Sequence, residues 1–187
     1  MKLKITKFKS LTSTNDKAIN LIQKHRHISG FIIADRQTKG RGTMGKKWIS
    51  KKGNIFISIF FKVNLAKIKI ENFLMINANI IKKVLKNYTT KNIKIKKPND
   101  LLIANKKICG ILQEVVEYNN EKFLISGIGI NTSNAPQHKK IASTFLKEHT
   151  KKIIKNLDII KNIKNNYENM IHDLNTNNFA YVKNKYI

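Results

Sequence analysis

The sequence predicts an α+β fold, in which a mixed, largely antiparallel sheet is backed by helices. Apolar runs with strand character follow one another with short polar connections, and such connections join antiparallel neighbours. Helical spacing of apolar residues is confined to three separate segments, whereas a Rossmann fold would alternate strands and helices far more regularly. The length of 187 residues suits one domain, so we expect residues 1–187 to form a single unit.

The first half of the chain contains two of these helical segments. Charged and apolar residues alternate over residues 1–9, which indicates a strand. Residues 13–16 (STND) then supply an N-cap and early acidic charge for a helix that runs to about His25. A glycine-rich stretch that ends at Trp48 is too polar and flexible for a regular element. The other elements expected here are strands over residues 31–34 and 54–63 and a helix over residues 71–88.

The second half predicts a meander of strands followed by a helix. Ile alternates with Lys or Asn over residues 92–97, as in a half-exposed strand, and a Pro-Asn-Asp turn follows at residues 98–100. Residues 119–121 are typical of a hairpin connection. Apolar residues from Ile153 to Leu174 keep helical spacing, which predicts one long helix. Further strands are expected over residues 101–104, 108–118 and 123–130.

Composition excludes several classes of protein. No apolar run reaches the roughly 18 residues that span a bilayer, and the N-terminus lacks a continuous apolar signal core. Cys109 is the only cysteine, so no internal disulfide can form, and a reducing cytoplasm is the expected location. No Cys or His spacing matches a structural metal site. We therefore expect neither a membrane partner nor a structural metal.

The formal net charge of +26 would ordinarily indicate a nucleic-acid partner. However, 34 of the 37 basic residues are Lys, and Ile, Lys and Asn together make up almost half of the chain. These three amino acids share A/T-rich codons, so the charge fits a compositional bias. The lysines are also spread along the whole chain, whereas readers of nucleic acid concentrate basic residues and use Arg for base contacts. DNA is therefore not an expected partner.

The stretch from Gly40 to Gly45 is the first of three segments whose residue types suit chemistry. Glycine lets backbone amides approach an anion closely, and Arg41 adds a planar bidentate donor. The segment lacks the GK[ST] ending of a Walker A motif, and it precedes a strand, unlike the dinucleotide-binding fingerprint. The alternative interpretation is a flexible surface loop.

The other two segments lie on the strand meander. Residues 96–111 (KKPNDLLIANKKICGI) place a carboxylate, an amide and lysines around one turn, where they suit an anionic ligand. A β-turn with solvated lysines remains the alternative. Residues 126–132 (SGIGINT) alternate glycine along a strand, which leaves one face without side chains, as where a flat ligand lies on the backbone. A tightly packed strand crossing is the alternative there.

Taken together and in this order, the segments resemble the biotin–protein ligases, also called biotin–[acetyl-CoA-carboxylase] synthetases. Ser13-Thr14-Asn15 matches the S-T-N segment of that family, and residues 34–48 (ADRQTKGRGTMGKKW) are similar to its Q-x-x-G-R-G-x-x-G-(R/K)-x-W signature. Residues 96–112 resemble its K-W-P-N-D-L…K-x-G-I-L segment, and residues 127–131 its G-I-G-I-N strand. The four motifs span about residues 10–135 at matching separations. The fold implied is that of the biotin–lipoate ligase catalytic domain, related to class II aminoacyl-tRNA synthetases.

The resemblance implies an enzyme that adenylates biotin with ATP and Mg²⁺ and passes biotin to a lysine of a carrier domain, that of acetyl-CoA carboxylase being the expected partner. Cations and N–H donors must then meet the biotin carboxylate and the α-phosphate. The implied catalytic residues are Arg41, Lys107 and Asp100, the last to organise the cations or to deprotonate the carrier lysine. The implied biotin contacts are Ser13, Thr14, Asn15, Gln37, Arg41, Gly42, Thr43 and Lys107. The implied ATP contacts are Gly40, Arg41, Gly42, Trp48, Lys96, Asn99 and Asn131, with Trp48 stacked on adenine and Asn131 bonded to it.

Several residues keep a plainer alternative. Trp48 would then cap the core and Asn15 would only be an N-cap, while Cys109 is expected in the core. Glu114 and Glu117 are expected to be solvated. Like them, His25 and His27 are expected to face solvent.

Two positions depart from the family pattern. Thr43 stands where the family often has a second Arg, so we expect the adenylate to leak faster. Lys97 replaces the usual Trp before Pro-Asn-Asp, which removes an aromatic wall, and Lys96 is expected to take up part of the anion binding. The length also leads us to expect neither an N-terminal helix-turn-helix nor the usual small C-terminal β-barrel. Homodimerisation through an exposed sheet edge is left open.

Two rival functions stay open. A lipoate–protein or octanoate–protein ligase would keep the fold and the adenylation chemistry but change the acid. A non-catalytic basic module for RNA or an acidic partner would show salt-sensitive binding that survives Arg41→Ala and Lys107→Ala.

Overall fold

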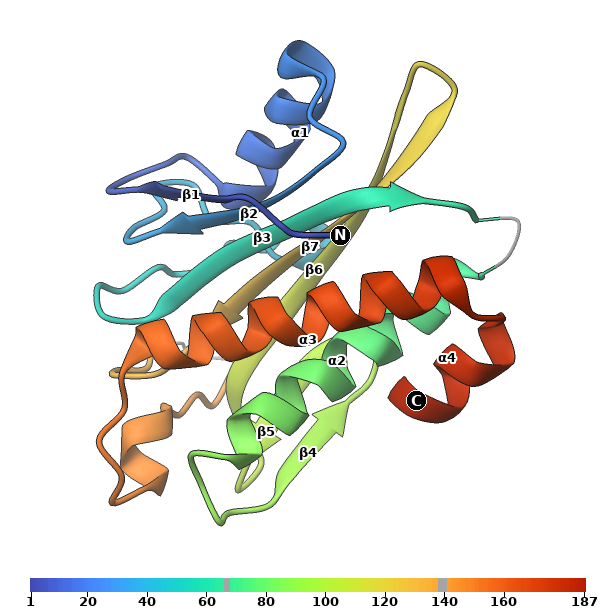
Figure 1. Cartoon of the computed structure of the whole chain (residues 1–187). Helices are drawn as coiled ribbons and strands as arrows, with labels where there is room; N and C mark the ends of the chain where they lie inside the picture. The colour runs from blue at the N-terminus through green and yellow to red at the C-terminus, as the bar shows by residue number, and fades with distance from the viewer. Residues whose placement is uncertain (66–67, 138–140) are drawn as a thin grey trace.

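A computed structural model describes residues 1–65, 68–137 and 141–187 of the chain (Figure 1). Within these ranges the strands form one seven-stranded sheet in the order β1-β2-β3-β7-β6-β5-β4. β1 runs parallel to β2, and every other neighbouring pair is antiparallel, so the predicted mixed, largely antiparallel sheet is confirmed. The strands are β1 (Ile5–Phe8), β2 (Ser29–Ala34), β3 (Ile55–Val63), β4 (Ile93–Lys96), β5 (Asp100–Ile103), β6 (Lys106–Tyr118) and β7 (Glu121–Ile130).

The helices cover the two faces of the sheet unequally. α2 (Ile70–Lys86) and α3 (Asn156–Thr176) lie side by side across one face, and the short α4 (Phe179–Tyr186) packs against both (Figure 1). α1 (Thr14–His25) packs on the other face, against β2, β3 and β7. The larger apolar core therefore lies under α2 and α3, and the smaller one under α1.

Side-chain alternation along β7 explains this division. Phe123 and Ile125 point toward α1, whereas Leu124 and Ile128 belong to the core under α2 and α3. Further along the α1 face, β7 has glycine at positions 127 and 129. The apolar packing under α1 consequently stops there, and that end of the sheet is left for polar residues.

The C-terminal region differs from its prediction. The helix begins at Asn156 and not at Ile153, whose side chain is 87% exposed and belongs to no apolar stripe. It ends at Thr176, and the separate helix α4 follows, capped by Asn178, whose side chain accepts a hydrogen bond from the Tyr181 amide. The apolar spacing that predicted one long helix holds only within α3. The first strand is likewise shorter than predicted, because it covers only Ile5–Phe8.

Candidate functional site

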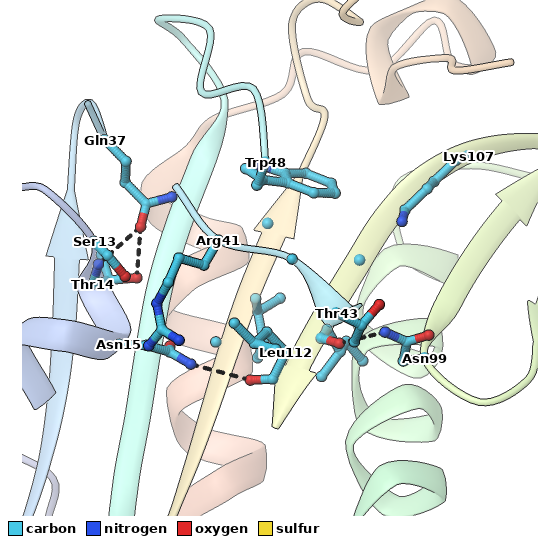
Figure 2. Close-up of a pocket in the computed structure, with 16 residues that line it drawn as sticks. Ser13, Thr14, Asn15, Gln37, Arg41, Thr43, Trp48, Asn99, Lys107 and Leu112 are labelled. Carbon is cyan, nitrogen blue, oxygen red and sulfur yellow. Dashed lines mark hydrogen bonds between the residues drawn. The ribbon is translucent and has the colours of Figure 1, made fainter. Parts of the chain in front are cut away.

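Two adjoining pockets open where α1, the glycine-rich stretch and strands β6 and β7 meet, and Figure 2 shows the first of them. The first holds about 450 Å³ of atom-free space and is lined by ten of the predicted site residues: Ser13, Thr14, Asn15, Gln37, Arg41, Gly42, Thr43, Trp48, Asn99 and Lys107. The second holds about 570 Å³ and is lined by Asn131, Ile49, Pro136, Ile141 and Ser143, among others. Gly42, Thr43, Trp48 and Lys107 line both pockets, so the two spaces meet at these residues.

The start of α1 supplies the polar end of the first pocket. Ser13 is the N-cap, because its hydroxyl accepts a hydrogen bond from the Asp16 amide at 3.3 Å. The Thr14 amide and hydroxyl both donate to Gln37 Oε1, at 2.8 and 3.1 Å (Figure 2). Gln37 in turn donates from Nε2 to the Ser50 hydroxyl at 3.1 Å. These groups are thus held in place before any ligand arrives.

Asn15 is buried at the bottom of this pocket and its amide is engaged inside the protein. Its Oδ1 accepts a hydrogen bond from the Ser58 hydroxyl, and its Nδ2 donates to Glu114 Oε2 at 2.7 Å and to the Leu112 carbonyl at 3.3 Å. The alternative that Asn15 is the N-cap is wrong, since Ser13 has that place. The Asn15 side chain therefore forms part of the pocket wall, and its amide group also holds Glu114 and Ser58 in place.

Arg41 binds two carboxylates. Nη1 and Nη2 donate to the two oxygens of Glu114 at 2.8 Å each, and Nη2 also lies 2.8 Å from Asp16 Oδ1. Burial alone lowers the pKa of Arg41, but the hydrogen bonds and charges of Glu114 and Asp16 outweigh it and raise that pKa. The expectation that Glu114 is solvated is therefore wrong, whereas Glu117 is exposed as expected.

Lys107 lies at the junction of the two pockets, next to a carboxylate and an aromatic ring. Its Nζ is 2.6 Å from Asp100 Oδ1 and 5.3 Å from the centre of the Trp48 ring. Leu101 pairs with Cys109 and Leu102 with Lys107, so β6 has one extra residue there, a β-bulge. Bulges near active sites re-aim a side chain, and this one adjoins Lys107. The predicted proximity of Lys107 and Asp100 is thus present in the structure.

The glycine face of β6 and β7 is covered by side chains. A Cβ atom on Gly129 would lie 2.4 Å from the Trp48 ring, and one on Gly127 would lie 2.2 Å from Asn15 Oδ1. Gly110, which pairs with Gly129, also faces the Trp48 ring. These glycines make room for Trp48 and Asn15 and also line the first pocket, so the flat ligand on this face stays a prediction.

Asn131 presents a buried oxygen in the wall of the second pocket. Its Nδ2 donates to the Thr144 carbonyl at 3.1 Å and to the Lys107 carbonyl at 3.5 Å. Among the described residues, no donor reaches its Oδ1, although that atom is buried. Buried polar atoms are normally paired, so this oxygen suits a ligand that donates a hydrogen bond.

The remaining predicted residues lie at the edges of the site. Gly40 borders a third, open groove beside the first pocket. Asn99 lines the first pocket, and its Nδ2 donates to the Ile111 carbonyl at 2.8 Å. Lys96 is exposed on β4 and lines neither of the two pockets. Cys109 is buried, and burial raises its thiol pKa, which agrees with a core role.

Sequence reasoning missed Asp16, Ser58 and Glu114. Glu114 follows Gly110 and Leu112 at a spacing of two residues, so strand alternation alone places it on the same face of β6. The contacts of Asp16 and Ser58 join segments far apart in the chain, and no local pattern predicts them.

Within the described ranges, none of the helices α1–α4 combines the length and the apolar character needed to cross a bilayer. The described residues also contain no cluster of three His, Cys, Asp or Glu side chains that would hold a metal ion.

The fold and the site together define a protein with two adjoining pockets, with a lysine at their junction and an arginine in the wall of the first. The chain belongs to the biotin/lipoate A/B protein ligase family, whose profile matches residues 6–131.

Individual relatives agree with this assignment. The bifunctional ligase/repressor BirA of Bacillus subtilis is 29% identical over 179 residues, which cover 92% of this chain and 55% of the relative. The biotin–[acetyl-CoA-carboxylase] ligase of Mycobacterium tuberculosis is 28% identical over 142 residues, or 72% of this chain and 51% of the relative. The chain therefore spans about half the length of these curated relatives.

A solved structure also matches closely. The biotin protein ligase of Aquifex aeolicus in complex with biotin and ATP superposes with a TM-score of 0.78 at 26% identity, covering 97% of this chain and 76% of that one.

Proposed function

We propose that this protein forms biotinyl-5′-AMP from biotin and ATP, with release of pyrophosphate, and then transfers biotin to a lysine of a biotin carboxyl carrier protein. The observation that carries the proposal is the pair of pockets that meet at Gly42, Thr43, Trp48 and Lys107. A two-substrate adenylation needs such a junction, because a carboxylate oxygen must reach the α-phosphate. The first pocket would take biotin and the second the nucleotide.

The chemistry requires positive charge at that junction. A carboxylate is inert toward amines, and the mixed anhydride with AMP provides a leaving group. Both reacting groups are anions, so they repel each other until cations and N–H donors neutralise them. Lys107 and the Gly42 backbone would supply a cation and an N–H donor at the junction. Arg41 would add a second cation from the side of the first pocket.

The polar end of the first pocket would recognise the biotin ureido ring. Ser13, Thr14 and Gln37 bring hydroxyl and amide groups to one place. Thr14 is fixed by its hydrogen bonds to Gln37, and the Ser13 hydroxyl by the one it accepts from the Asp16 amide. A pocket built to pair with a buried polar ring rejects ligands that lack it, because its own groups would be left unpaired.

In the second pocket, Asn131 Oδ1 would accept a hydrogen bond from the adenine amine, which would satisfy the unpaired oxygen. Trp48 would offer the ring on which adenine stacks, and its position is fixed by Gly110 and Gly129 behind it.

Mg²⁺ would enter with the triphosphate and would neutralise phosphate charge as pyrophosphate departs. Mg²⁺ takes oxygen ligands, and the Asp100 carboxylate is the acidic group beside Lys107. That carboxylate fits such a role once Lys107 turns to the substrate anions, so the residues present are compatible with the ion.

In the transfer step, the carrier lysine amine attacks the carbonyl carbon of the adenylate, and AMP leaves with the electrons of the C–O bond. The amine must lose a proton as the amide forms. Asp100, half-buried beside Lys107, would accept it or hold Lys107 in place while another base does. The carrier domain of acetyl-CoA carboxylase is the partner we propose, since relatives are named for that enzyme. We place the reaction in the cytoplasm, where that carrier is made and a single buried thiol stays reduced.

Family membership alone does not choose between biotin and lipoate. Two features favour biotin over lipoate or octanoate. The curated relatives reported above are biotin ligases or the related ligase/repressor. The polar Ser13–Thr14–Gln37 end of the pocket also suits a ureido ring better than an aliphatic or dithiolane end.

The test is biotin-dependent exchange of radioactive pyrophosphate into ATP, which reports adenylate formation without a carrier. We expect exchange with biotin, little with lipoate or octanoate, and a loss of about 100-fold or more in Lys107→Ala, as for removal of one transition-state donor. Lys106→Ala, which changes the exposed neighbouring lysine on β6, is the matched control and should retain activity. Exchange with lipoate but not with biotin would overturn the choice of acid. No exchange with any of the acids would overturn the proposed activity.

A further inference from the structure

The glycine-rich stretch from Gly40 to Trp48 forms a small hairpin of its own, here called the glycine-rich hairpin. The Trp48 amide donates to the Gly40 carbonyl at 2.9 Å, and the Gly42 amide donates to the Lys46 carbonyl at 2.7 Å. A short 3₁₀ turn at Thr43–Gly45 forms its tip. These backbone hydrogen bonds join the two arms of the hairpin to each other and not to the sheet. Side chains therefore hold the hairpin against the sheet.

This unit carries three of the four residues that line both pockets, namely Gly42, Thr43 and Trp48. Its position therefore sets the wall between the two ligands. If the hairpin moves away from the sheet, both pockets open together.

Arg41 links one arm of the hairpin to the sheet. Its guanidinium makes a two-pronged ion pair with Glu114 on β6 and a further contact with Asp16 on α1, all at 2.8 Å. Paired N–H···O bonds of this kind fix orientation as well as distance. The side chains are 38% exposed for Arg41 and 25% for Glu114, so this is a surface-edge pair whose value comes from its geometry.

Glu114 is held in place by a buried residue, Asn15. Asn15 Nδ2 donates to Glu114 Oε2 at 2.7 Å, and Asn15 Oδ1 accepts from the buried Ser58 hydroxyl on β3. Asn15 is pressed against the Gly127 backbone, where a Cβ atom would come within 2.2 Å of its oxygen. Figure 2 shows Asn15 and Arg41 next to each other below the hairpin strand. A continuous polar chain therefore runs from the sheet interior through Asn15 and Glu114 to Arg41.

We propose that Glu114 is a positioning residue that holds Arg41, and with it the glycine-rich hairpin, against the sheet, and thereby slows the escape of ligand from the first pocket. In the described structure the contacts to Glu114 and Asp16 use only Nη1 and Nη2 of Arg41. Arg41 can thus stay anchored while its Nε–H serves a substrate anion. The ligand retained is biotinyl-adenylate, so this part rests on the proposed function.

The first test uses the protein without ligand. Glu114→Gln keeps the shape of the side chain and removes its charge. Glu117→Gln, on the exposed opposite face of β6, is the matched control. We expect acrylamide to quench the fluorescence of Trp48, the single tryptophan of the chain, about twofold more strongly in Glu114→Gln and equally in the control, because the ring packs against Gly110 and Gly129 only while the hairpin lies on the sheet. Equal quenching in Glu114→Gln and the unaltered protein would overturn the anchoring, whatever the activity of the protein.

The second test separates retention from catalysis. With adenylate formed in place, we expect its release to be about tenfold faster in Glu114→Gln, a larger change than that in the rate of its formation, because Lys107 and the Gly42 backbone remain at the junction. Adding Glu114→Gln to Arg41→Ala should bring little further change, because the anchor is already broken. Slower release in Glu114→Gln would instead show that Glu114 competes with the ligand for Arg41 and would overturn the proposal. If the unaltered protein forms no adenylate, the proposed function fails, and the quenching measurement still decides on the anchor.

Discussion

Lys107 and Arg41 carry the same charge but have different surroundings. Lys107 has one carboxylate partner, Asp100, and lies at the junction of the pockets beside the Trp48 ring. Arg41 has two carboxylate partners, Asp16 and Glu114, and belongs to the glycine-rich hairpin. A single short-range partner leaves Lys107 free to exchange it for a substrate anion. Arg41 is better placed to anchor its segment while it contributes donors at the edge of the pocket.

Thr43 offers a test of charge at the junction. It lines both pockets, so an Arg at this position would add a cation next to the adenylate phosphate. We predict that Thr43→Arg slows the release of biotinyl-adenylate by about tenfold, as expected for one added charged hydrogen bond. Release is measured by chasing labelled adenylate with unlabelled biotin.

The neighbouring residue gives the matched control. Met44→Arg adds the same charge at the tip of the hairpin, where the native side chain is 88% exposed, and should leave release unchanged. Equal release from Thr43→Arg and the unaltered protein would contradict a retention role for charge at position 43.

At the level of single elements, β7 supports the site because its glycines have no side chain there. The three atoms nearest to a Cβ on Gly129 all belong to the Trp48 ring, the closest at 2.4 Å. We predict that Gly129→Ala displaces the ring and weakens ATP binding by about tenfold, since an added methyl in a packed contact costs on the order of 1–3 kcal/mol. Titration calorimetry with ATP measures this directly.

The control for this prediction is a second background. In Trp48→Ala the space above residue 129 is open, so adding Gly129→Ala should have little further effect on ATP binding. If Gly129→Ala weakened binding equally in both backgrounds, the methyl group would be acting on something other than Trp48.

Helix α3 is tied to its surroundings by two acidic residues. Burial alone raises the pKa of Glu168, but hydrogen bonds from Lys164 and the Leu3 amide outweigh it and bring the pKa below its ordinary value. The carboxylate thereby fixes the chain just before β1 to α3. The charged form is the one that the folded protein stabilises.

Asp173 connects α3 to α4 in the same way, through Lys185 and Tyr186. Burial alone raises its pKa, but hydrogen bonds from Lys185 and Tyr186 outweigh it and lower the pKa. Two lowered carboxyl pKa values mean that the folded protein binds these protons less readily than the unfolded chain. Their stabilisation is present above the ordinary pKa near 4 and is lost as the pH falls through the lower folded-state values.

We therefore predict that the free energy of unfolding declines as the pH drops below about 4, and that Asp173→Asn makes this decline shallower. Denaturant unfolding at a series of pH values between about 2 and 7 measures it. Asp158→Asn, at an exposed position in the first turn of the same helix, is the control and should leave the decline unchanged. A decline that is equally steep in Asp173→Asn would contradict this account of α3 and α4.

The element level also shows what the sequence could and could not predict. Strands and helices with a clear period of two or about 3.6 residues were predicted within a few residues, as α1, α2 and β3 show. The separate helix α4 was missed because its apolar stripe is weak and only Val182 is buried. The packing of Asn15 and Trp48 against the glycine face of β7 could not be predicted, because both residues come from distant segments.

For the whole molecule, the fold brings together motifs that lie far apart in the chain. The S-T-N segment, the glycine-rich hairpin and the Lys107 and Gly127–Gly129 strands all line the first pocket. The resemblance of these motifs to those of the biotin–protein ligases implied this convergence. The Arg41–Glu114 anchor was not predictable in that way, because it depends on register across β6 and on the path of the hairpin. Long-range ion pairs of single residues leave no periodic trace in a sequence.

The net charge of +26 is also a property of the whole molecule. It would attract acidic partners at low salt, and this attraction is screened beyond about 8–10 Å at physiological salt. Specificity must therefore come from the pockets. That distinction separates the proposed ligase from a general binder of polyanions.

The most direct test of the central claim is transfer of biotin to a purified biotin carboxyl carrier domain, with ATP and Mg²⁺ present, read on a streptavidin blot. We predict labelling that requires ATP, that is lost in Lys107→Ala and that persists in Lys106→Ala. Absence of labelling by the folded protein, or labelling that Lys107→Ala leaves intact, would contradict the assignment of biotin ligation to these two pockets.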